Sequence, residues 1–107
     1  MMKERLRKDI QQIVDQVVAL AHPRRILLFG SAAEGKVQEG SDLDFLIVTD
    51  DDQQPAALAD RLNVHVRKKP MPCDFLVVTE SALHRQRNNP GLIYAEILDR
   101  GKQVYAA

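Results

Sequence analysis

The sequence predicts a single domain of the α+β class, in which helices and strands alternate along the chain (an α/β order). An amphipathic helical pattern occupies residues 3–21. Three short apolar segments, at 24–29, 43–49 and 73–79, have the β-branched and aromatic content of buried strands. The length of 107 residues is that of one ordinary domain, and the 45% of hydrophobic residues suffice for a core.

The first helix has apolar residues at helical spacing on one face and charged or polar residues on the other. The residue before a proline disfavours the helical conformation, so Pro23 should end this helix at or before His22. We interpret the helix as a packing element. Binding of a partner through this helix is the alternative.

Turn and cap residues define the remaining elements. Pro55 suits a first helical position, Thr79 can cap a helix, and Asn89-Pro90 combines an N-cap with a first-turn proline. Gly101 can close the helix that Asn89-Pro90 opens. We therefore expect a loop at 36–41, helices at 56–66, 80–87 and 90–100, and a final edge strand at 103–105.

Composition narrows the class of function. Lysines plus arginines number 15, as do aspartates plus glutamates, so no net basic field favours direct nucleic-acid binding. The one cysteine, Cys73, excludes an internal disulfide and fits a reducing compartment. The N-terminus lacks a signal-peptide core, and no apolar run approaches the roughly 20 residues that span a bilayer. We expect a cytoplasmic protein without a membrane partner.

Gly30-Ser31 follows the first strand, Ser31 can cap a helix that begins at Ala32, and Gly35 can end that helix within about one turn. Glycine permits backbone angles and close approaches that other residues refuse. A strand that feeds a helix N-terminus through Gly-Ser presents free N–H groups, which suit an anion. A tight strand-to-helix turn with no ligand is the alternative interpretation.

Three aspartates stand at the starts of strands. Asp42 and Asp44 are two residues apart, so on an extended chain both side chains point the same way. Asp74 lies near the start of the third strand, beside apolar residues. Two like charges on one face repel unless a cation lies between them, and carboxylates suit Mg²⁺ or Mn²⁺. If the strands share a sheet, these groups could converge at one rim.

Gly30-Ser31, ten intervening residues and Asp42-Leu43-Asp44 match the Gly-Ser-x10-Asp-x-Asp pattern of the DNA polymerase β-like nucleotidyltransferases. The chain resembles this family from about Ile26 to Tyr105. Its small size resembles the minimal nucleotidyltransferases, which are often encoded beside a HEPN-domain protein. The resemblance implies the family's fold, a small mixed sheet backed by helices, in one minimal nucleotidyltransferase domain over residues 1–107.

The resemblance also implies a role for each site residue. Gly30 and Ser31 would hold the β- and γ-phosphates of ATP or another nucleoside triphosphate. Asp42 and Asp44 would bind two Mg²⁺ ions, with Mn²⁺ as the alternative. Asp74 would complete the catalytic metal's shell and help to deprotonate the attacking hydroxyl. The implied activity is transfer of AMP from ATP to a hydroxyl of a partner protein, with this chain as the antitoxin of a HEPN-domain toxin.

One departure from the family concerns the residues after Gly-Ser. Many minimal nucleotidyltransferases carry arginine there, whereas this chain has Ala32 and Ala33. Three cations could compensate: Lys36, Arg24 and Arg25. We also expect no second domain to grip an acceptor, so the acceptor is held by a partner, by an oligomer mate, or is the partner itself.

Two alternatives to the enzyme stay open. The chain could be a non-catalytic binding module that neutralises a HEPN-type ribonuclease by complex formation, which the small size and the missing arginine favour. It could also be an α/β domain whose aspartates merely cap strands and bind adventitious cations. A homo- or hetero-oligomer is compatible with the enzyme and with the binding module.

Overall fold

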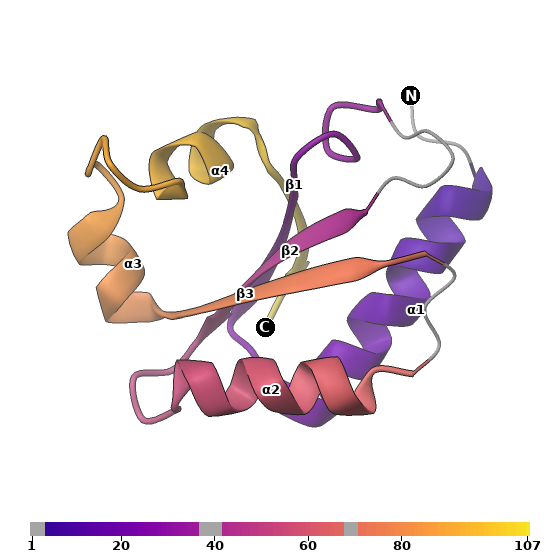
Figure 1. Cartoon of the computed structure of the whole chain (residues 1–107), viewed down its shortest axis with the longest axis horizontal. Coiled ribbons are helices and arrows are strands. Elements are labelled where there is room, and N and C mark those ends of the chain that lie inside the picture. Colours follow the sequence, from indigo (N-terminus) through magenta and orange to yellow (C-terminus); the bar gives the residue numbers. More distant parts are fainter. Residues whose placement is uncertain (1–3, 37–41, 68–70) are drawn as a thin grey trace.

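A computed structural model of the chain describes residues 4–36, 42–67 and 71–107, and Figure 1 shows their arrangement. Its helices and strands follow one another in the order α1 (Glu4–Ala21), β1 (Arg25–Phe29), β2 (Leu43–Thr49), α2 (Pro55–His65), β3 (Cys73–Thr79), α3 (Glu80–Gln86), α4 (Tyr94–Arg100) and β4 (Lys102–Ala106). The predicted α+β class is confirmed, although β1 is followed directly by β2 and α3 by α4, and the second and third strands have the expected bounds.

The four strands form one mixed sheet in the order β3-β2-β1-β4. Strand β1 pairs antiparallel with both β2 and β4, whereas β2 pairs parallel with β3. The predicted mixed sheet is therefore confirmed, and β4 is the edge strand expected near the C-terminus. No helix within the described ranges is long and apolar enough to cross a membrane.

Helices cover both faces of the sheet (Figure 1). Alternate residues of β2 point to opposite faces because the side-chain period of a strand is two. Leu43, Phe45 and Ile47 join the core under α1 and α2, where Phe45 stacks on Phe75 with ring centroids 5.9 Å apart. Leu46 and its neighbours on the other face join a smaller core under α3 and α4. Strand β2 is thus buried on both sides, which fixes the position of its first residues.

Helix α1 buries the apolar face that its sequence predicted. The buried side chains are Ile10, Ile13, Val14, Val17 and Ala21. His22 leaves the helix with φ of 46° while its N–H still donates to the Val18 carbonyl at 3.0 Å. Pro23 follows, so the helix ends where the sequence predicted.

Two local expectations were wrong. The helix expected from Pro90 begins only at Tyr94, because Asn89 forms a local turn instead: its side-chain oxygen accepts from the Gly91 N–H at 3.0 Å. The segment after Ser31 forms a single turn rather than a helix, and Gly35 leaves it with φ of 73°. The loop expected at 36–41 falls, apart from its first residue, outside the described residues.

Candidate active site

The end of β1 and the starts of β2 and β3 meet at one rim of the sheet. In the antiparallel pairing Phe29 lies opposite Asp44, and in the parallel pairing Asp44 lies opposite Asp74. Because β2 is central, Asp44 has the Gly-Ser turn on one side and Asp74 on the other. The predicted convergence is therefore observed for Gly30, Asp44 and Asp74.

Gly30 makes the close contact between the turn and Asp44 possible. Its φ is 76°, a left-handed conformation that favours glycine. A Cβ atom at this position would lie only 2.6 Å from Oδ2 of Asp44, so any side chain would displace the carboxylate. Ser31 follows in an exposed turn, where its carbonyl accepts from the backbone N–H of Glu34 at 3.2 Å and of Lys36 at 2.8 Å. The turn therefore presents its backbone directly to the carboxylate of Asp44.

The three aspartates interact electrostatically. Burial raises the pKa of Asp44 above its ordinary value, and the negative charges of Asp74 and Asp42 raise it further. A side-chain hydrogen bond between Asp44 and Asp74 also contributes to the raised pKa. Asp42 and Asp74 are exposed, whereas Asp44 is half-buried. The site concentrates negative charge around Asp44, and a bound cation would relieve it.

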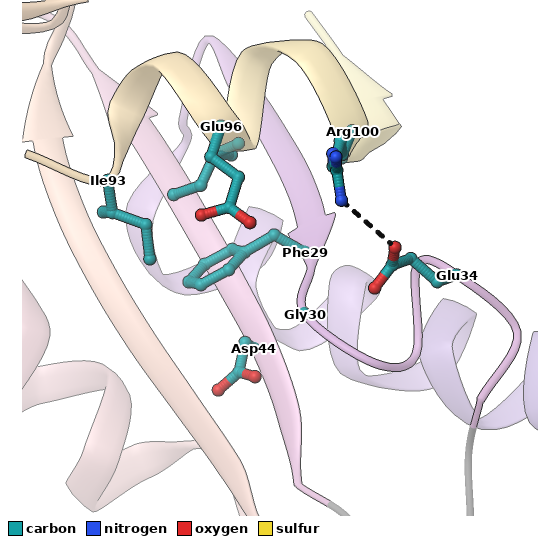
Figure 2. A pocket seen from close by; sticks show the side chains of 9 residues that line it. Phe29, Gly30, Glu34, Asp44, Ile93, Glu96 and Arg100 are labelled. Atoms are coloured by element: carbon teal, nitrogen blue, oxygen red, sulfur yellow. Dashed lines mark ion pairs between the residues drawn. The ribbon is translucent and has the colours of Figure 1, made fainter. Parts of the chain in front are cut away.

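A cavity of about 220 Å³ opens between the Gly-Ser turn and α4 (Figure 2). Its lining combines apolar side chains, three carboxylates and one guanidinium: Phe29, Gly30, Glu34, Asp44, Ile93, Glu96, Ile97, Arg100 and Gly101. Arg100 and Glu34 form an ion pair across one end, with Nη1 and Oε1 3.8 Å apart. The cavity thus connects the aspartate site with the C-terminal end of α4.

The contribution of α4 to this cavity was not predicted from the sequence. Ile93, Glu96, Ile97 and Arg100 are spaced by three, one and three residues, which places them along one face of a helix. That spacing was readable from the sequence, but nothing in it indicated that this face would meet Gly30 and Asp44.

The two alanines after Ser31 belong to the hydrophobic core. Ala32 is 0% exposed and Ala33 is 5% exposed, and both pack in the core under α1 and α2. An arginine at either position would have to enter or disrupt that core. The packing therefore favours a small apolar residue at both positions.

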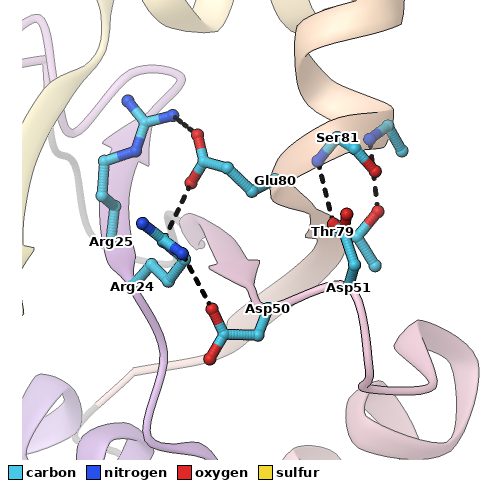
Figure 3. Close-up of polar contacts among 8 residues, drawn as sticks. Arg24, Arg25, Asp50, Asp51, Thr79, Glu80 and Ser81 are labelled. Carbon is cyan, nitrogen blue, oxygen red and sulfur yellow. Dashed lines mark hydrogen bonds and ion pairs between the residues drawn. The ribbon is translucent and has the colours of Figure 1, made fainter.

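Arg24 and Arg25 do not compensate for the missing arginine. They stand at the opposite end of β1 from Gly30, where Arg24 binds Asp50 at 3.0 Å and Arg25 binds Glu80 at 2.9 Å (Figure 3). Arg24 also approaches the second carboxylate oxygen of Glu80, at 3.7 Å. Lys36, the third cation considered, is exposed after the turn and is absent from the described lining of the cavity.

The donor chemistry of the rim fits a divalent cation. Carboxylate oxygens are hard ligands that suit Mg²⁺ and Mn²⁺. Asp44 has a raised pKa and shares a side-chain hydrogen bond with Asp74, so a cation bound between the two carboxylates would offset their repulsion. Within the described residues, no three His, Cys, Asp or Glu side chains are already grouped as a ready metal site. Asp42 is exposed and acts on Asp44 through its negative charge.

Comparisons with known proteins agree with this geometry. The family model of the nucleotidyltransferase domain matches residues 4–103. The fold is similar to the crystal structure of a candidate nucleotidyltransferase from Sulfolobus solfataricus, with a TM-score of 0.57, 23% identity, and coverage of 76% of this chain and 73% of that one. It is also similar to a chain in a crystal structure of a toxin-antitoxin with AMP-PNP, with a TM-score of 0.57, 20% identity, and coverage of 94% and 73%. No curated protein gave a significant match.

Proposed function

This chain belongs to the nucleotidyltransferase domain family, and from that premise we propose that it is a single-domain Mg²⁺-dependent enzyme. The proposed reaction transfers a nucleotidyl group, AMP from ATP, to a hydroxyl of a partner protein. The observation that carries the proposal is the position of Asp44, which lies in contact range of Gly30 and in register with Asp74.

Each residue has a defined task in the proposed reaction. Backbone N–H groups of Gly30 and Ser31 bind the β- and γ-phosphates, since a turn that presents backbone N–H groups suits an anion. Asp42, Asp44 and Asp74 would hold the metal, and Mg²⁺ would supply positive charge near the triphosphate and the attacking oxygen. Asp74 accepts the proton of the acceptor hydroxyl. That oxygen forms a bond to the α-phosphorus as the bond to the bridging oxygen breaks, and pyrophosphate leaves.

The raised pKa of Asp44 supports this assignment of the aspartates. Two carboxylates that share a hydrogen bond and repel a third are unfavourable as a purely structural arrangement. The repulsion between these carboxylates destabilises the folded domain, and a bound cation would offset that destabilisation. Their position at the rim, rather than within the core, leaves them open to a metal–nucleotide complex.

The proposed acceptor is a HEPN-domain protein, with this chain as its antitoxin. The similarity in fold to a toxin-antitoxin chain solved with AMP-PNP supports a nucleotide and a partner toxin. The test incubates the protein with α-labelled ATP, Mg²⁺ and the protein encoded beside it. Label should pass to the partner with wild-type protein and not with the Asp42→Asn/Asp44→Asn variant. Label transfer that survives both substitutions would refute the mechanism.

A second candidate is a non-catalytic antitoxin that neutralises a HEPN-type ribonuclease by binding it. The core position of Ala32 and Ala33 favours it, because neither residue directly after Gly-Ser supplies a cation for the phosphates. Neutralisation that persists in the Asp42→Asn/Asp44→Asn variant would support binding alone. Loss of neutralisation while the complex still forms would support the enzyme.

A further inference from the structure

The proposed triphosphate site has a deficit of positive charge. The cavity beside Gly30 carries the carboxylates of Glu34, Asp44 and Glu96, and a triphosphate would add further negative charge. A metal ion at the aspartates would offset part of it at the α-phosphate. The terminal phosphates, near the Gly-Ser turn, still need a cation from the protein, since charge-assisted bonds are the strong contacts to phosphate.

Arg100 is in the right place to supply that cation. Of the described residues that line the cavity, it is the one with a basic side chain, and Figure 2 shows it extending from α4 toward Glu34, beyond Gly30 as seen from Asp44. Its guanidinium can donate to two phosphate oxygens at once, which a lysine ammonium does less well. Gly101 follows directly, and its close packing fixes the end of α4: a Cβ there would lie 2.5 Å from the Ile97 carbonyl and 3.1 Å from the Leu28 carbonyl. The root of the Arg100 side chain is therefore anchored against β1.

We propose that Arg100 binds the terminal phosphates of the nucleoside triphosphate and takes the part of the arginine that the chain lacks after Gly-Ser. The inference rests on the proposed function, because it assumes that the triphosphate lies between the Gly-Ser turn and Asp44. It adds a residue from α4, an element outside the sequence motif, to the nucleotide site.

Glu34 pairs with Arg100 beside the turn, and a bound triphosphate would compete with it for the guanidinium. The two groups are 3.8 Å apart, and their side chains are 67% and 42% exposed, so water screens the pair and it contributes little stability. Arg100 can therefore leave Glu34 for a phosphate at small cost. Removing the charge of Glu34 should strengthen triphosphate binding, because it frees Arg100 and removes a repulsive carboxylate.

The test measures nucleotide binding by the full chain in Mg²⁺, with ATP and AMP as ligands. We compare wild type with Arg100→Gln, Arg100→Lys and Glu34→Gln, and use Arg87→Gln as the control, because Arg87 is exposed at the end of α3 and does not line the cavity. Arg100→Gln should weaken ATP binding roughly 10- to 100-fold, the equivalent of one lost charge-assisted bond. Its effect on AMP should stay below about threefold, since AMP lacks the terminal phosphates.

The other variants test whether the loss of ATP affinity is specific to the charge of Arg100. Arg100→Lys should recover part of the ATP affinity, Glu34→Gln should equal or exceed wild type, and Arg87→Gln should match it. ATP binding by Arg100→Gln that equals that of Arg87→Gln would overturn the role of Arg100 while leaving the proposed function standing. An equal loss for ATP and AMP would refute the assignment to terminal phosphates. Wild-type protein that binds no ATP in Mg²⁺ would overturn the proposed function, and the role of Arg100 with it.

Discussion

Replacement of Asp44 by asparagine should stabilise the metal-free protein while it removes nucleotide binding. The substitution keeps the shape of the side chain and deletes one of three negative charges at the rim. Burial and the charges of Asp74 and Asp42 raise the pKa of Asp44, so the ionised carboxylate is held at a cost in the folded state. Asparagine does not carry that cost, and its amide can donate to Asp74.

The register of the sheet sets the size of the effect. Asp44 lies directly opposite Asp74, where like charges destabilise a sheet; since cross-strand pairs are worth about 0.2–1 kcal/mol each, we expect removal of this charge to gain about that much. For a domain of this length such a gain raises Tm by roughly 1–6 °C. Mg²⁺ with ATP at about 100 times Kd would stabilise wild type by about 2.7 kcal/mol, and the variant should gain nothing. The order of stability should therefore reverse when ligand is added.

The gain should depend on pH in a definite direction. A carboxyl group whose pKa is raised in the folded protein stabilises it fully below the unfolded pKa, about 3.9, and loses that contribution as pH rises through the folded pKa. The advantage of Asp44→Asn should thus be present at neutral pH and disappear in acid. Asp60→Asn, on the exposed surface of α2, is the matched control and should change stability by less than about 0.5 kcal/mol.

Differential scanning fluorimetry or urea unfolding in EDTA, with and without Mg²⁺ and ATP, gives both arms of this test. A lower Tm for metal-free Asp44→Asn than for wild type would refute the electrostatic reasoning about the rim. Equal stabilisation of the variant and wild type by Mg²⁺ and ATP would refute the role of Asp44 in the site.

Three further predictions concern stability and can be measured by urea unfolding. Gly30→Ala should cost about 1–3 kcal/mol of stability because of its φ of 76°, and it should also lose nucleotide binding. The control is Gly35→Ala, which has a similar φ of 73° but no atom within 4 Å of a new Cβ, so it should show the backbone strain alone. Equal nucleotide binding by both variants would contradict the Gly30–Asp44 contact. Thr79→Ala should cost about 1 kcal/mol, because its hydroxyl accepts from the Ala82 N–H at 3.2 Å and caps α3; no loss would argue against the cap. Thr49→Val should stabilise by about 1 kcal/mol, because the buried Thr49 hydroxyl has no hydrogen-bond partner among the described residues; a loss of stability would indicate that it has one.

The parts of the fold that local chemistry determines could be predicted from the sequence. Strand β2 alternates apolar residues between two faces, and both faces are buried as that pattern indicates. The rim that joins Gly30 to Asp44 could also be expected, because a strand ending in glycine and strands beginning with aspartate meet at one edge when the strands pair. These features depend on residue type and short-range period, which the sequence carries directly.

Features that depend on tertiary packing were not predictable in the same way. The start of α4 is set by a competing turn at Asn89, and the cavity forms because α4 packs against β1, which no local pattern reveals. The position of Arg100 beside Glu34, far along the chain, is a result of the same packing. Likewise, the sequence shows that residue 24 is an arginine but not where its side chain lies. The fold pairs Arg24 with Asp50 at the opposite end of β1 from Gly30.

Intact-mass measurement of the partner protein tests the central claim most directly. The partner would be incubated with ATP, Mg²⁺ and either wild-type protein or the Asp42→Asn/Asp44→Asn variant. Nucleotidyl transfer predicts that the mass of the partner increases by one AMP moiety, with release of pyrophosphate, and that the variant produces no increase. An unchanged mass with wild type, an increase equal to a phosphate alone, or the same AMP addition with the variant would contradict it.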